Sequence, residues 1–296
     1  MKLTSTLSLI LIFFLGISIG FSQTNMDKKP FQIFDKKGNS TTYESLYNSC
    51  LEADIILFGE LHNNSIIHWL QLELSKDLSL DSNVSVVFGA EMFEKHQQMP
   101  LNEYLSGVSN FKTFKTETKL WNNTKTDYLP LVDVAKNTES NFTATNVPRI
   151  LAKQVAKMGL DSFYNILNDS IKELMAPAPI PIDYKAPGYK ELLEMDFGGQ
   201  HGMNTKLMVE AQALKDATMA SSILQSFEEG KKYLHFHGNF HSKNWGGIAW
   251  YLNEYDKKKR ILIISSEESK DGSFNSEWKK SADYIFVTPE NMTKTY

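Results

Sequence analysis

The chain has 296 residues, of which 42% are hydrophobic, and a formal net charge of -4. This length and composition allow a sizeable buried core, and an acidic balance without a basic stripe argues against nucleic acid as a partner. Cys50 is the only cysteine, which excludes an internal disulfide. Packing must therefore stabilise the fold.

The first 22 residues have the pattern of a secretory signal peptide. Lys2 precedes an apolar run from Leu7 to Phe21, and the small residues Gly20 and Ser22 suit a cleavage after Ser22. The run is shorter than the roughly 20 residues that span a bilayer, and no cysteine follows it to carry a lipid anchor. We predict an exported protein, periplasmic or extracellular, whose mature chain, residues 23–296, is a single domain that neither spans the membrane nor carries a lipid.

Short apolar segments rich in β-branched residues predict the strands. They cover residues 55–59, 84–88, 142–145, 233–236, 261–264 and 284–288. Longer segments with helical spacing separate them, as at Ile66–Leu80 and Lys206–Phe227. This alternation predicts an α/β fold with a mostly parallel central sheet flanked by helices. In such sheets, ligands gather outside the carboxyl ends of the strands.

Residues 176–204 break the alternation. They contain four prolines and four glycines, and they are too long for an ordinary connection. Two interpretations stay open at this point. The segment is either a helical insertion with a proline-rich start, or a lid or ligand-binding element.

Two Gly-x-x-His elements directly follow predicted strands. They are Gly59–His62 and Gly238–His241, and Glu91 stands at the end of a third strand. Two imidazoles and a carboxylate at strand ends suit a catalytic metal, whereas the alternative is that each residue caps a helix or is satisfied in the core. His237 either joins this site or forms buried hydrogen bonds with His235.

Other catalytic chemistry has little support in the sequence. There is no Gly-x-Ser-x-Gly elbow, phosphate-binding glycine loop or dinucleotide fingerprint. Cys50 precedes the first predicted strand without a nearby base, so we interpret it as a buried, inert thiol. His68 and His96 fall in predicted helices and are interpreted as structural.

Together, these motifs resemble the ChaN family of haem-binding uptake proteins. The resemblance runs from about residue 55 to 288 and rests on Gly59-Glu60-x-His62, Gly89–Phe93, Asn146–Arg149, Asp216–Ala220 and Gly238-Asn239-x-His241. It implies a protein that binds haem outside the cytoplasm in haem or iron acquisition. It also implies a haem receptor or transporter as a partner, and a homodimer as one form of assembly.

The same residues are similar to a wider superfamily that includes Tiki-type metalloproteases, TraB-like proteins and erythromycin esterases. That likeness implies an alternative function, an exported metal-dependent peptidase or esterase. Zinc or manganese would be bound by His62, Glu91, His241 and His237. Glu91 would also polarise water, and Asp216 would orient a histidine.

The haem ligand is not identified by any motif. Phenolate and imidazole both bind haem iron, so Tyr184, Tyr189 and His201 are candidates by chemistry. Arg149 either pairs with a haem propionate or braces the fold through a carboxylate. The candidates for an apolar pocket lining are Leu192, Leu193, Met195, Phe197, Met203, Met208 and Met219. We therefore expect a haem-binding protein rather than an enzyme.

Overall fold

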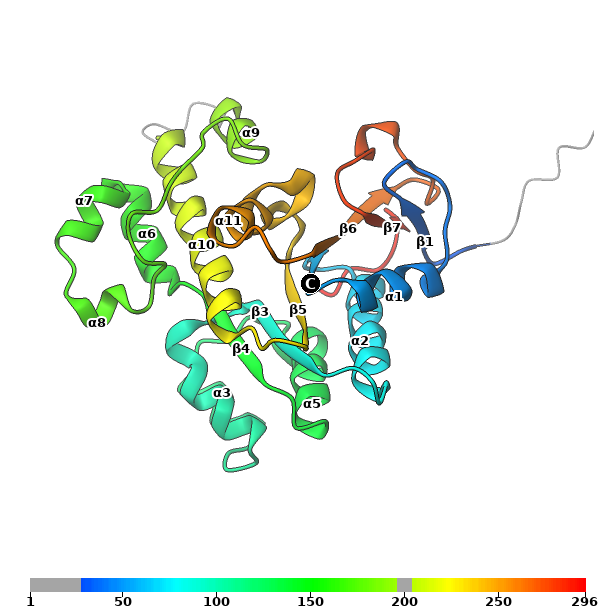
Figure 1. Cartoon of the computed structure of the whole chain (residues 1–296), viewed down its shortest axis with the longest axis horizontal. Helices are drawn as coiled ribbons and strands as arrows, with labels where there is room; N and C mark the ends of the chain where they lie inside the picture. Colours follow the sequence, from blue (N-terminus) through cyan, green and yellow to red (C-terminus); the bar gives the residue numbers. More distant parts are fainter. Residues whose placement is uncertain (1–27, 196–203) are drawn as a thin grey trace, which may run out of the picture.

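The structure is a computed structural model that describes residues 28–195 and 204–296 (Figure 1). The predicted signal peptide, residues 1–22, lies outside this part of the chain. So do three residues of the predicted haem pocket, which are Phe197, His201 and Met203.

One mixed sheet forms the centre of the fold. Its strands are β1 (Gln32–Asp35), β2 (Ile55–Glu60), β3 (Val86–Glu94), β4 (Phe142–Asn146), β5 (Lys232–Gly238), β6 (Ile261–Ser269) and β7 (Tyr284–Pro289). They are arranged in the order β1-β7-β6-β2-β5-β3-β4, and every neighbouring pair is parallel except β1 with β7. The predicted α/β class with a mostly parallel sheet is confirmed. The short antiparallel strand β1 was not predicted.

Helices connect the strands. They are α1 (Tyr43–Glu52), α2 (Ser65–Leu80), α3 (Gln98–Leu105), α4 (Phe111–Glu117), α5 (Leu129–Asn137), α6 (Arg149–Met158), α7 (Leu160–Asn165), α8 (Asp169–Lys172), α9 (Tyr189–Glu194), α10 (Thr205–Ser226) and α11 (Gly247–Tyr255). Side-chain caps start the two predicted helices, because Asn64 accepts from the first amides of α2 and Asn204 does so for α10. None of the helices in the two described ranges is long and apolar enough to cross a bilayer.

The sheet is buried on both faces. Along β2, Ile56 and Phe58 point into a core shared with α1, α2 and α5, whereas Ile55 and Leu57 point into a second core with α10 and α11. Figure 1 shows these two groups of helices on opposite sides of the strands. This explains why the central strands appear in the sequence as unbroken apolar runs.

A third apolar cluster holds α6 and α7 against α10. Leu151 and Val155 of α6, Phe163 of α7 and Leu214 of α10 are among its buried members. Figure 1 shows α6, α7 and α8 together beyond α10, away from the sheet. This packing leaves α6 and α10 as neighbours with one shared groove between them.

The described part of the proline-rich segment has little regular structure. Residues 176–188 form neither helix nor strand, and the short helix α9 follows them. Tyr251 of α11 donates a hydrogen bond to the carbonyl of Pro181 at 2.7 Å, and Tyr189 is buried in the core beside α10. The segment is therefore packed onto α10 and α11 through specific contacts.

Candidate functional site

The sheet brings both Gly-x-x-His elements to one edge. β5 lies between β2 and β3, with Gly59 paired to His237 and Glu60 paired to Gly238. Glu91 lies in β3 where its pairing with β4 becomes irregular, between Ala90 and Glu94. An irregularity of this kind redirects side chains near a strand end, and it turns Glu91 toward the end of β5.

His241 lies buried between two carboxylates. Its Nδ1 pairs with Asp216 of α10, and its Nε2 is 3.1 Å from an oxygen of Glu91. Burial alone would lower the pKa of His241, but the charges of Glu91 and Asp216 outweigh burial and raise the pKa to about 10. His241 is therefore an imidazolium at neutral pH. Burial alone would likewise raise the pKa of Glu91, yet the charge of His241 holds it well below its usual range.

Further donors complete this cluster. The backbone N–H of Gly238 donates to Glu91 Oε2 at 2.7 Å, and the hydroxyl of Tyr189 donates to Asp216 Oδ2 at 2.7 Å. The two carboxylates are thus each held by His241 and by one other group. We call His241, Glu91 and Asp216 the His241 cluster.

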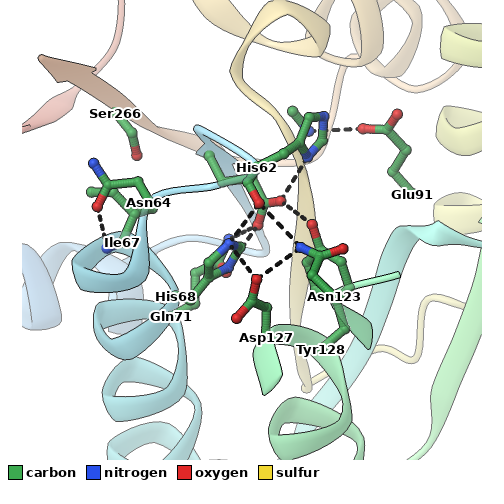
Figure 2. A network of polar contacts seen from close by, with 12 residues as sticks. His62, Asn64, Ile67, His68, Gln71, Glu91, Asn123, Asp127, Tyr128 and Ser266 are labelled. Atoms are coloured by element: carbon green, nitrogen blue, oxygen red, sulfur yellow. Dashed lines mark hydrogen bonds and ion pairs between the residues drawn. The ribbon is translucent and has the colours of Figure 1, made fainter. Parts of the chain in front are cut away.

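His62 belongs to a neighbouring polar network with His68, Gln71 and Tyr128 (Figure 2). The carboxylate of Glu60 is at its centre. His62 Nδ1 is 2.7 Å from Glu60 Oε1, and the same carboxylate accepts hydrogen bonds from Gln71 and Tyr128, each at 2.8 Å. Burial lowers the pKa of His62, but the hydrogen bond and charge of Glu60 give a net upward shift. His68 is also part of this network, with Nε2 3.0 Å from the carbonyl oxygen of His62.

The two networks meet at Gly238. A Cβ at this position would lie 2.6 Å from His62 Nε2 and 3.5 Å from Glu91 Oε2. Only glycine leaves room for both side chains at this point of the turn. This close approach gives a physical reason for the glycine in the second Gly-x-x-His element.

His235 and His237 form a separate buried pair. Their Nδ1 atoms are 3.1 Å apart, His235 Nε2 is 2.7 Å from the hydroxyl of Thr145, and His237 Nε2 is 2.8 Å from the hydroxyl of Ser242. Burial lowers the pKa of His235 to about 3 and shifts that of His237 in the same direction. The structure matches the second interpretation of His237, in which a neutral imidazole forms buried hydrogen bonds.

The predicted metal set does not form a metal site in this arrangement. Within residues 28–195 and 204–296, no group of three His, Cys, Asp or Glu side chains is placed to hold a metal ion. In this arrangement the two ring nitrogens of His241 pair with the carboxylates of Asp216 and Glu91. His62 and His237 also direct ring nitrogens to protein partners. The structure therefore does not support zinc or manganese, or the hydrolase that would need it.

A cavity of about 550 Å³ lies beside the His241 cluster. One wall is a single face of α6, formed by Arg149, Ala152, Lys153 and Ala156. These residues follow the three- and four-residue spacing of a helix face. The wall thus combines small apolar side chains with two cations.

The opposite wall belongs to α10. Met208, Ala211, Gln212 and Lys215 follow the same spacing, and Leu192 and Phe240 complete the lining. Gln212 also contacts the His241 cluster, with Nε2 2.9 Å from His241 Nδ1. Because His241 is protonated, we expect the amide of Gln212 to present its oxygen to the ring. The cavity and the buried cluster are therefore in direct contact through α10.

The described residues that were predicted to bind haem differ in their position relative to the cavity. Arg149 lines the cavity, and its guanidinium lies 5.8 Å from the centre of the Trp121 ring. Tyr184 donates to Glu210 at 3.1 Å, and burial together with that carboxylate raises its pKa to about 12. Tyr189 is 1% exposed and donates to Asp216, so its phenol is already used. Neither tyrosine lines the cavity.

Several residues of the cavity and of the Glu60 network were not predicted from the sequence. Lys153, Gln212 and Lys215 line the cavity, and Gln71 and Tyr128 hold Glu60. The helical spacing of the cavity residues was a detectable signal. The pairing of α6 with α10, which turns that spacing into a cavity, was not. Of the predicted apolar lining, Leu192 and Met208 face the cavity, whereas Met219 is fully buried in the core.

The chain matches one known protein family over most of its length. A family model described as haem-binding uptake, Tiki superfamily, ChaN, matches residues 46–252. The chain is therefore a protein of the Tiki superfamily. Within that superfamily, it belongs to the ChaN family of haem-binding uptake proteins, as the sequence motifs predicted.

One solved structure shows the same fold, and two others are more distantly similar. ChaN of Campylobacter jejuni, described with cofacial haem binding, has a TM-score of 0.66 and 19% identity, over 88% of this chain and 97% of that chain. A Bacillus cereus protein has a TM-score of 0.49 and 13% identity, over 83% and 90% of the two chains. A mutant erythromycin esterase in its open conformation has a TM-score of 0.45 and 13% identity, over 81% and 77%. No curated protein matches the chain.

Proposed function

We propose that this protein binds haem and acts outside the cytoplasm as a step in haem or iron acquisition. Membership of the haem-binding uptake family supports haem as the ligand class. The observation that carries the proposal is the cavity between α6 and α10. Its volume of about 550 Å³ lies within the range of about 300–1,000 Å³ that is usual for small-molecule sites.

The residues of the cavity fit a haem. A haem is a flat apolar ring with two propionate carboxylates on one edge, and the lining combines alanine, leucine, methionine and phenylalanine side chains with Arg149 and two lysines. Aromatic Phe240 is 41% exposed and is available to lie against the ring. Arg149 would pair with a propionate through its planar guanidinium.

The iron of a bound haem would supply ligand and redox chemistry at this cavity. Met208 carries a thioether in the described lining, and thioethers bind haem iron in other proteins. His201 stays a candidate ligand outside the described residues. Tyr184 and Tyr189 are weaker candidates, because both phenols stay protonated and donate to carboxylates.

Export and partners complete the proposal. The predicted signal peptide supports transfer to the periplasm or the extracellular space. A haem receptor or transporter would deliver or receive the haem. We propose a homodimer as the assembly, which size-exclusion chromatography with light scattering would test.

A hemin titration of the mature protein tests the proposed function. We expect a saturable Soret band that is shifted from that of free hemin. Ala156→Trp would fill the cavity from α6 and should reduce binding, whereas Met158→Trp on the exposed side of the same helix should not. The proposal fails if the wild-type spectrum is that of loosely adsorbed hemin, or if both variants bind as the wild type does.

A further inference from the structure

The two helices that line the cavity run antiparallel. Just after the end of α6, the N–H of Leu160 donates to Glu210 near the start of α10, at 2.8 Å. At the other end, Ser222 of α10 donates to the carbonyl of Thr145 in β4, the strand that precedes α6, at 3.1 Å. The start of α6 therefore lies beside the later part of α10.

This direction separates the lining into two ends. Arg149 and Lys153 occupy the first half of α6, and Lys215 comes from the part of α10 that lies opposite them. Ala156 and Met208 lie toward the other end. The cavity thus has one cationic end and one apolar end.

The cations are not neutralised within the described structure. Arg149, Lys153 and Lys215 form no ion pair with any residue in the two described ranges, and the described lining contains no Asp or Glu. Lys215 is half-buried, whereas Lys153 is exposed. An apolar cavity with such an end favours a flat apolar ligand that has its anionic groups along one edge.

From this polarity, and building on the proposed haem site, we propose that the cavity recognises the two carboxylates of a porphyrin independently of its iron. The ligand class is then the dicarboxylic porphyrins as a whole. Metal-free protoporphyrin IX carries the same ring and the same two carboxylates as haem. It should therefore bind in the same orientation, with its carboxylates at Arg149, Lys153 and Lys215.

Paired titrations of the mature full-length protein test this inference. Hemin binding is followed by the Soret band, and protoporphyrin IX binding by its fluorescence. The variants are Arg149→Gln and Lys215→Gln, and the matched control is Lys157→Gln, which removes an exposed cation from α6 outside the lining. We expect the wild type to bind both porphyrins saturably. Either variant should weaken binding about tenfold, because it loses one charge-assisted contact, whereas the control should bind as the wild type does.

The outcomes separate this inference from the proposed function. If hemin binds but protoporphyrin IX does not, iron ligation dominates, and the inference is wrong while haem binding stands. The inference is also wrong if Arg149→Gln and Lys215→Gln bind both porphyrins as well as Lys157→Gln does. If neither porphyrin binds the wild-type protein, the haem proposal and this inference fail together.

Discussion

Replacing His241 by glutamine would remove the cation that two buried carboxylates share. The side chains of His241, Glu91 and Asp216 are 7%, 8% and 1% exposed, so water cannot replace the lost charge. Breaking a buried ion pair by removing one partner costs about 3–5 kcal/mol, because the remaining charge stays buried and uncompensated. We expect His241→Gln to lower the free energy of unfolding at pH 7 by about this amount.

The pH dependence gives a second measure of the same interaction. The pKa of His241 rises from 6.5 to about 10 on folding. The stabilisation is therefore complete below pH 6.5 and declines as the pH rises toward 10. In that window the native state holds one more proton than the unfolded chain, and stability falls by about 1.4 kcal/mol per pH unit. Between pH 7 and pH 9 the free energy of unfolding of the wild type should fall by about 3 kcal/mol. The variant lacks His241 and should not show this fall.

Urea unfolding followed by circular dichroism at pH 7, 8 and 9 measures both effects. His96→Gln is the matched control, because the His96 side chain is 48% exposed and lies 3.5 Å from Glu94, where an ion pair contributes less than about 1 kcal/mol. Groups far from the His241 cluster titrate equally in the wild type and the variant, so the difference in slope reports on the proton that the cluster holds. Parallel declines in the two proteins would refute the assignment of the proton to His241.

Three further predictions follow from buried positions. Gly238→Ala should lower the unfolding free energy by about 1–3 kcal/mol, because its Cβ would lie 2.6 Å from His62 Nε2. In the same urea assay, a His62→Ala background should reduce that loss. Tyr189→Phe should lower the unfolding free energy by about 1–3 kcal/mol, because Asp216 loses a hydrogen-bond donor. Hemin binding should stay unchanged, and loss of the Soret shift in this variant would contradict the prediction. Cys50 is fully buried, and burial raises its pKa to about 12. A thiol reagent at pH 8 should therefore react with Cys50 only when the protein unfolds. Rapid labelling of the native protein would disprove the buried position of Cys50.

The central strands could be predicted because they are buried on both faces. Every residue from Ile55 to Glu60 is buried, and such a strand appears as a continuous apolar run. The first strand, Gln32–Asp35, has only four residues with a buried pair in the middle, and it lies at the sheet edge against Tyr284–Pro289. A pattern this short does not stand out in the sequence. The strand order is also invisible there, because it depends on how the connecting helices pack.

The composition of the candidate site was only partly predictable. The sequence showed that His62, Glu91 and His241 would meet at one sheet edge, and the register of the strands brings them there. It did not show which partner each histidine would take. Glu60, two residues before His62, holds that ring, whereas His241 is held by Asp216, which comes from a helix 25 residues earlier. Pairing of this kind is decided by tertiary packing.

Asp216 connects the second Gly-x-x-His element to α10, because its carboxylate pairs with Nδ1 of His241. The other ring nitrogen, Nε2, is 3.1 Å from an oxygen of Glu91, so His241 joins α10 to β3. Asp216 also lies on α10, one residue after Lys215 of the cavity wall and four after Gln212, which contacts His241. The His241 cluster therefore fixes α10 against β3 and the turn after β5. The second Gly-x-x-His element thus acts on the cavity in two ways. Phe240 lines the cavity, and His241 sets the position of the α10 wall without lining it.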